Sequence, residues 1–143
     1  MTPYVIDASV AAKWFLPPSG EPLAAEALRL LAGYARGQIR FAVPDLFWAE
    51  CGNILWKAVR QGRWSRSAAE KAILALKNRS FPTTSSHDLL EEAFSIAATF
   101  DRAVYDSLYV ALAVRLKADM VTADERFANA LAAHLPVKWL GAV

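Results

Sequence analysis

The sequence predicts an α/β domain built around a mostly parallel sheet. Short apolar runs alternate along the chain with longer segments of helical periodicity, which is the pattern of strands connected by helices. The chain has 143 residues, of which 55% are hydrophobic, and this is enough for one domain with a substantial core. We therefore expect a single domain over residues 1–143.

The first half of the chain contains two predicted strands and two predicted helices. An apolar run places the first strand at residues 3–7, and apolar positions at helical spacing place a helix at 21–36. A second strand follows at 40–43, and the next helix, at 45–61, opens with a Pro-Asp pair. Gly62 is expected to end that helix, because glycine readily takes the left-handed conformation.

The second half continues the alternation of helices and strands. Ser65 and Ser85 precede helical patterns and are expected to act as N-caps, Ser86 being the alternative to Ser85. The predicted helices are 65–78, 85–100, 105–117 and 124–133, and the predicted strands are 82–84, 119–122 and 137–140.

Composition narrows the class of protein. No apolar run reaches the ~18–20 residues of a membrane span, and the N-terminus lacks the charged and apolar regions of a secretory signal. The single cysteine, Cys51, cannot form an internal disulfide, which fits a reducing compartment. We expect a cytoplasmic protein without membrane association. The high apolar content, with five tryptophans, favours a second buried surface, as in an oligomer or a tight complex.

Four acidic residues stand where a domain would normally avoid charge. Asp7 ends the first predicted strand, and Asp124 comes shortly after the apolar pair Met120-Val121. Glu50 interrupts one long apolar stretch, and Asp106 opens another. Buried carboxylates are costly unless they are paired, and basic residues are scarce beside these four. Because parallel sheets bind ligands at the carboxyl ends of their strands, the four can meet at one edge around a divalent metal ion.

The type of donor predicts the type of ion. Oxygen ligands alone select hard cations such as Mg²⁺ or Mn²⁺. Zinc prefers histidine and cysteine, and His87, His134 and Cys51 lack the spacing of zinc ligands.

Each acidic residue also has an ordinary structural interpretation. Glu50 forms a polar stripe with Asn53 and Lys57 on an otherwise apolar helix, which fits either a pocket wall or an exposed face. Asp106 and Asp124 stand at helix starts, where the helix dipole favours acidic residues.

A serine and a basic segment complete the candidate features. Ser9 can hold Asp7 or a metal-bound water, or it can cap a helix that begins near Val10. Residues 57–79 carry seven Lys and Arg against a single Glu, which suits a phosphate backbone or a solvated helix face.

These motifs together resemble the PIN-domain family, and more narrowly the VapC-type ribonuclease toxins of type II toxin–antitoxin systems. The matching pieces occur in the family's order and span nearly the whole chain. They are Val5-Ile6-Asp7-Ala8-Ser9, Pro44-Asp45-Leu46 with Glu50, Asn53 and Leu55, the run Tyr105 to Ala113, and Val121-Thr122-Ala123-Asp124-Glu125-Arg126-Phe127.

The resemblance implies a fold and an activity. The fold is a three-layer α/β/α sandwich around the parallel sheet. The activity is an Mg²⁺-dependent endoribonuclease, with Mn²⁺ able to substitute, in which metal-activated water cleaves an RNA phosphodiester. The partners are an RNA substrate, a small cognate antitoxin that blocks the acidic site, and a second copy in a homodimer. The metal-binding and catalytic residues are Asp7, Glu50, Asp106 and Asp124, supported by Ser9, Asn53 and Thr122.

Two surfaces are candidates for these partners. Basic residues interleaved with Trp56 and Trp64 suit single-stranded RNA, unless the tryptophans are core residues. The apolar run 14–16, followed by two prolines, is a candidate groove for the antitoxin or a further part of the core. The candidate RNA-binding residues are Lys57, Arg60, Arg63 and Arg66.

Two rival functions stay open. A phosphatase or phosphotransferase would use Asp7 as nucleophile, but usually carries a second Asp two residues later, where this chain has Ser9. A binding-only PIN domain would have lost its acidic residues, and all four are present.

Overall fold

The computed structural model describes residues 1–143, and its centre is a five-stranded parallel sheet in the order β3-β2-β1-β4-β5. In the middle of the sheet, Val5 pairs with Ala42 on one side and Met120 on the other. The strands are β1 (Thr2–Ile6), β2 (Ile39–Pro44), β3 (Thr83–Thr84), β4 (Asp119–Thr122) and β5 (Val137–Trp139).

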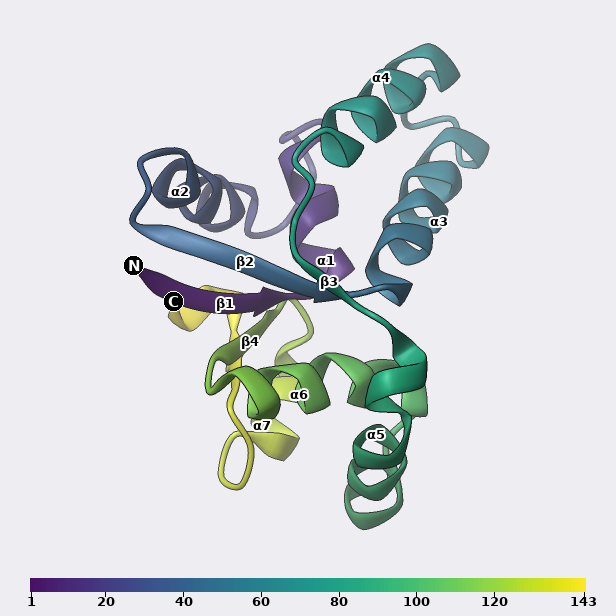
Figure 1. Ribbon diagram of the computed structural model, residues 1–143. Helices are drawn as coiled ribbons and strands as arrows, with labels where there is room; N and C mark the ends of the chain where they lie inside the picture. Colours follow the sequence, from purple (N-terminus) through teal and green to yellow (C-terminus); the bar gives the residue numbers. More distant parts are fainter.

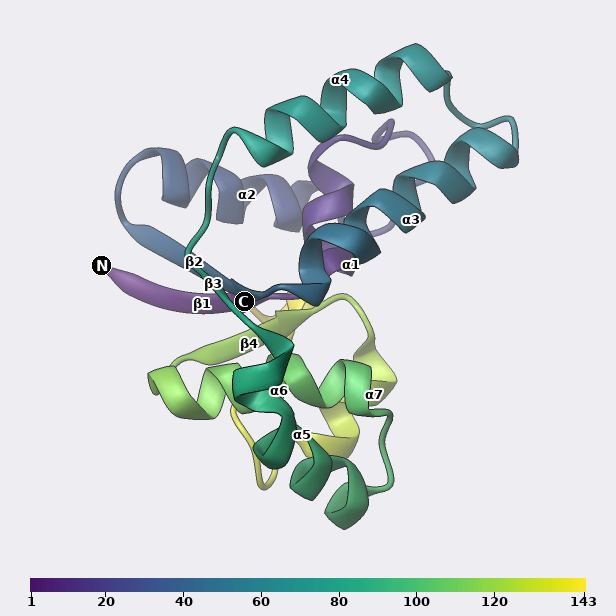
Figure 2. The same ribbon diagram turned by 45° about the vertical axis from the view of Figure 1, so that its right-hand side comes forward.

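Helices cover both faces of the sheet. Figures 1 and 2 show α1 to α4 on one face and α5 to α7 on the other, which confirms the α/β/α sandwich. No helix has both the length and the apolar character required to cross a membrane. The helices are α1 (Ala8–Ala11), α2 (Ala24–Ala35), α3 (Leu46–Arg60), α4 (Arg66–Lys77), α5 (Ser86–Phe100), α6 (Val104–Leu116) and α7 (Glu125–Leu131), with the 3₁₀ helices η1 (Ala12–Trp14) and η2 (Leu140–Ala142).

The order of the strands defines where a ligand can bind. The chain runs outward from β1 through β2 to β3, and then returns to the other side of β1 to form β4 and β5. The direction therefore reverses between β1 and β4, and parallel sheets open a crevice at such a point beyond the carboxyl ends of the strands. The residues that directly follow β1 and β4 lie at this crevice.

Most predicted helix ends are confirmed. The hydroxyls of Ser65 and Ser85 accept hydrogen bonds from the N–H groups of Ala68 and Asp88, and Gly62 takes the left-handed φ of 73°. The start of α3 differs, because Pro44 belongs to β2 and Asp45 makes no side-chain cap.

The largest hydrophobic cluster fills the space around the central strands. On the α1–α4 face, the rings of Trp14 and Phe81 both pack against Phe41, with centroid distances of 5.5 Å. Trp14 and Leu16 are only 9% and 5% exposed. These two are core residues, and the interpretation of residues 14–16 as an open groove for an antitoxin is wrong.

Candidate functional site: a carboxylate cleft at the switch point of the sheet

Asp7 lies at the crevice between β1 and β4. Its N–H continues the sheet by donating to the carbonyl oxygen of Val121 at 3.0 Å. Its Oδ2 accepts hydrogen bonds from the hydroxyls of Ser9, at 2.8 Å, and Thr122, at 2.9 Å. Burial raises the pKa of Asp7, and the two hydroxyls lower that pKa in part.

The same two hydroxyls connect Asp7 to the turn after β4. Ser9 Oγ accepts from the N–H of Ala123 at 3.2 Å, and Thr122 Oγ1 accepts from the N–H of Asp124 at 3.1 Å. Ser9 makes no cap for α1, because the residue at that helix start is Asp7. Of the two interpretations of Ser9, the structure therefore supports the one in which it holds Asp7.

Asp124 is exposed and has a structural duty of its own. Its Oδ1 accepts a hydrogen bond from the N–H of Phe127 at 3.0 Å, which caps α7. The capping interpretation is therefore correct. A carboxylate in this position also keeps its second oxygen free for a ligand.

Glu50 is held by a residue that sequence analysis did not single out. Tyr109, fully buried in α6, donates its hydroxyl hydrogen to Glu50 Oε1. Burial raises the pKa of Glu50, and the charges of Asp7 and Asp106 add to that rise, whereas the Tyr109 hydrogen bond lowers it. A buried tyrosine hydroxyl needs a hydrogen-bond partner. The presence of Tyr109 in a mostly apolar helix is therefore the sequence signal that could have pointed to this contact.

Asp106 stands in the first turn of α6, and its carboxylate makes no hydrogen bond within the protein. Burial raises its pKa, and the negative charges of Asp7 and Asp124 raise it further. The positive charge of Arg102 lowers the same pKa. The negative charges of these acidic groups therefore act on one another across the crevice.

A cleft of about 390 Å³ opens between α1, α3 and the start of α6. The polar stripe predicted on α3 lines it, so Asn53 and Lys57 face the same space as Glu50. Asp124 lies instead in an adjoining cleft of about 510 Å³, and Asp106 lines both. The polar and charged residues of the first cleft are Asp7, Ser9, Glu50, Asn53, Lys57 and Asp106.

The donor set fits a hard divalent cation. None of the four carboxylates forms an ion pair with Lys or Arg, and all the donors in the cleft are oxygen or amide groups apart from Lys57. As the side chains stand, no three Asp, Glu, His or Cys groups are close enough to share an ion. Mg²⁺ does not need three, because it usually takes one or two carboxylates and keeps several waters.

The proposed basic segment is only partly near this cleft. Lys57 lines it, whereas Arg60, Arg63 and Arg66 lie further along α3 and beyond its end. Arg66 pairs with Glu70 at 3.0 Å on the exposed face of α4.

The two tryptophans of this segment have different environments. Trp56 is 52% exposed and available for stacking, while Trp64 packs against a small apolar cluster.

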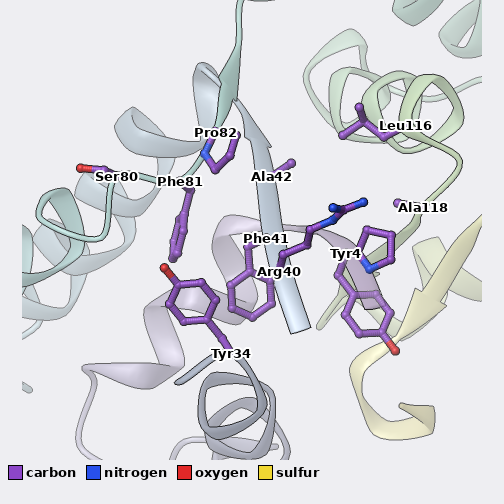
Figure 3. A pocket seen from close by; sticks show the side chains of 11 residues that line it. Tyr4, Tyr34, Arg40, Phe41, Ala42, Ser80, Phe81, Pro82, Leu116 and Ala118 are labelled. Carbon is purple, nitrogen blue, oxygen red and sulfur yellow. The ribbon is translucent and has the colours of Figure 1, made fainter. Parts of the chain in front are cut away.

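Other candidate centres carry no catalytic chemistry. Burial and the charges of Asp7 and Glu50 raise the pKa of the buried Cys51 thiol, which disfavours the reactive thiolate. A separate hollow of about 330 Å³, shown in Figure 3, lies along β2 between Tyr34, Phe81 and Leu116. It contains no carboxylate and is lined mainly by apolar groups, so it is not the candidate metal site.

Comparison with known families agrees with the fold. The model of the PIN domain family matches residues 4–131, a range that includes all four acidic positions. The chain belongs to the PIN domain family.

Individual relatives cover most of the chain. Ribonuclease VapC3 of Pyrobaculum aerophilum is 28% identical over 127 residues, which cover 87% of this chain and 92% of that protein. The crystal structure of PAE2754 from the same organism superposes with a TM-score of 0.69 at 23% identity, covering 99% of this chain and 85% of that one. A chain of a toxin–antitoxin complex from Klebsiella pneumoniae superposes with a TM-score of 0.62 at 17% identity, covering 94% of this chain and 95% of that one.

Proposed function

We propose that this chain is a metal-dependent endoribonuclease that acts as the toxin of a toxin–antitoxin pair. The observation that carries the proposal is the uncompensated charge at the switch point. Asp7, Glu50 and Asp106 line one cleft, burial raises all three pKa values, and no Lys or Arg forms an ion pair with them. A bound cation would compensate the negative charge of such a cluster.

The residues of the cleft have separate tasks in this proposal. Asp7, fixed by Ser9 and Thr122, and Glu50, fixed by Tyr109, offer carboxylate oxygens at constant positions. The Asp106 carboxylate makes no hydrogen bond and is free to turn toward an ion. When bound, Mg²⁺ supplies Lewis-acid chemistry by lowering the pKa of a water and neutralising charge on the phosphoryl oxygens.

Lys57 contributes a positive charge to the same cleft. An RNA chain is a polyanion, and a cluster of carboxylates repels it unless cations stand nearby. Lys57 lowers this repulsion on the α3 side. No histidine lines the cleft, so the proposed reaction uses no imidazole as general acid or base.

A protein partner is part of the proposal. Two relatives support this part of the proposal. One is named Ribonuclease VapC3, and a chain of the same fold occurs in a toxin–antitoxin complex. This chain also exposes large apolar side chains on the α3–α4 pair, where Trp56 is 52% and Leu74 61% exposed. An antitoxin segment or a second copy of the chain would remove such surface from water.

Cleavage of labelled RNA in Mg²⁺ tests the activity. Transfer RNA, ribosomal fragments and unstructured oligomers would be incubated with the protein, with a chelator, and with the Glu50→Gln variant. Glu91→Gln is the matched control, because Glu91 is exposed on α5 and forms no ion pair. Since the metal contributes several kcal/mol, we expect Glu50→Gln to reduce cleavage by roughly 100-fold or more and Glu91→Gln to leave it unchanged.

The products identify the chemistry. Attack by water leaves 5′-phosphate and 3′-hydroxyl ends. Products ending in 2′,3′-cyclic phosphate would contradict the metal-dependent route, and cleavage that persists in Glu50→Gln would remove this residue from the site. Absence of cleavage with every RNA and metal would favour a binding-only domain.

A further inference from the structure

The acidic site opens on a second side, away from α3. The adjoining cleft of about 510 Å³ is formed by the turn between α5 and α6 together with the start of α7. Asp106 lines both clefts, so the two meet at its carboxylate. The second cleft contains two arginines, Arg102 and Arg126.

The backbone places both arginines beside acidic residues. Asp101 ends α5 in the left-handed conformation with φ of 55°, and α6 begins three residues later at Val104. Arg102 occupies this sharp turn, four residues before Asp106. Arg126 stands in the first turn of α7, two residues after Asp124.

Both guanidinium groups are without an acidic partner. Three carboxylates line the same cleft, yet neither arginine forms an ion pair. Elsewhere on this surface, Arg115 pairs with Glu92 at 3.0 Å. The one side-chain hydrogen bond of the two arginines runs from Arg102 Nε to the carbonyl oxygen of Phe100, at 3.3 Å, and leaves the terminal nitrogens free.

Arg102 nevertheless lies beside the acidic site, because it lines the same cleft as Asp106. Arginine binds phosphate through parallel N–H groups and is the residue best suited to that task. Two unpaired guanidinium groups in one cleft, next to a carboxylate shared with the candidate metal site, therefore form a binding place for phosphate groups.

We infer that Arg102 and Arg126 bind the phosphates of the RNA chain on one side of the cleavage point, with Lys57 on the other. The inference rests on the proposed ribonuclease function. The RNA backbone would then run from the α3 cleft across Asp106 into the α5–α6 cleft. Contacts to phosphate fix the position of a strand and carry no base information, so these residues position the substrate without selecting its sequence.

RNA binding by single and double variants tests the inference. Arg102→Gln, Arg126→Gln and the double variant would be compared with wild type by fluorescence anisotropy of a labelled single-stranded RNA, in chelator so that no cleavage occurs. Arg29→Gln is the matched control, because Arg29 is exposed on α2 and forms no ion pair. Melting temperatures would be measured for all variants, and kcat and KM for cleavage in Mg²⁺.

The expected result is weaker binding with a lower dependence on salt. Each lost phosphate contact reduces the slope of log K against log salt by about 0.7 for a single strand. KM should rise several-fold with a smaller change in kcat, and Arg126→Lys should recover part of the loss. Arg29→Gln should behave as wild type.

Two other outcomes overturn the inference. If wild type binds and cleaves RNA and neither arginine variant changes the affinity, the salt slope or KM, the inference is wrong and the proposed function stands. If wild type neither binds nor cleaves any RNA, the proposed function fails and the inference fails with it.

Discussion

At the scale of single residues, the site depends on hydroxyl groups as much as on carboxylates. Asp7 is held by Ser9 and Thr122, and Glu50 is held by Tyr109. Each hydroxyl favours the charged form of its partner and so lowers a pKa that burial raises. The hydrogen bonds thereby hold both carboxyl groups at fixed positions, which is what the proposed metal site requires.

The Tyr109→Phe variant tests this role of a hydroxyl. It removes only the oxygen that donates to Glu50, so we expect cleavage and apparent Mg²⁺ affinity to fall by about 10- to 100-fold, the usual cost of losing a group that orients a metal ligand. Cleavage rates over a range of Mg²⁺ concentrations would measure both effects.

The control for Tyr109→Phe is Tyr34→Phe, because the Tyr34 hydroxyl makes no hydrogen bond and lies by the separate hollow along β2 (Figure 3). Equal activity in the two variants, with equal Mg²⁺ dependence, would show that the Glu50–Tyr109 contact has no part in the site.

At the scale of elements, the site is assembled from four segments that are distant in sequence. Asp7 directly follows β1 and Thr122 ends β4. Glu50 lies on α3, and the start of α6 supplies Asp106. The parallel pairing of β1 with β4 brings the first two together across 115 positions of the chain. The Asp7–Thr122 hydrogen bond is therefore also a connection between the two halves of the fold.

The Thr122→Val variant tests that connection. Valine keeps the buried shape but removes the hydrogen bond to the Asp7 carboxyl group, which contributes about 1–3 kcal/mol, and leaves the N–H of Asp124 without its partner. Urea unfolding at neutral pH should show a loss of this order, accompanied by lower cleavage.

Thr2→Val is the comparison for this variant, because Thr2 is exposed at the start of β1 and makes no side-chain hydrogen bond. A Thr122→Val protein as stable as Thr2→Val would mean that the bond to Asp7 adds nothing to the fold.

At the scale of the whole molecule, the acidic cluster reduces stability in the absence of a cation. The pKa values of Asp7, Glu50 and Asp106 are all raised in the folded state. A raised pKa means that the folded protein binds the proton more tightly than the unfolded chain does. The stability linked to these groups is therefore fully present below their unfolded pKa and is lost as pH rises through the folded pKa.

The Asp106→Asn variant should consequently be more stable than wild type when both are free of metal. The Asp106 carboxylate makes no hydrogen bond, so this substitution relieves repulsion from Asp7 and Asp124 without breaking one. We expect a rise in Tm of roughly 2–4 °C at pH 7.5, which shrinks as pH falls through the raised pKa and disappears once Asp106 is protonated.

Calorimetry in chelator and in Mg²⁺ would measure this difference. Mg²⁺ should raise the Tm of wild type more than that of the variant, because the ion binds only the folded state. Two results would contradict the prediction. Equal Tm values for wild type and Asp106→Asn at pH 7.5 without metal would contradict the repulsion, and a wild-type Tm unaffected by Mg²⁺ would contradict the proposed metal site.

The sequence by itself determined the alternation of strands and helices, most helix ends, and the four acidic positions. These follow from local rules: apolar periodicity, serine caps at Ser65 and Ser85, and the cost of charge beside apolar runs. The polar stripe on α3 was predicted in the same way, because Glu50, Asn53 and Lys57 share one helix face.

Only the tertiary structure decided which groups meet. The contact between Tyr109 and Glu50 joins positions 59 residues apart, and the sequence of the mostly apolar α6 does not say which group the tyrosine hydroxyl will meet. The structure likewise showed that Trp14 is core, that Ser9 serves Asp7, and that Arg102 faces the acidic site. The physical reason is that a local pattern fixes the direction of a side chain, whereas its partner depends on how the sheet brings remote segments together.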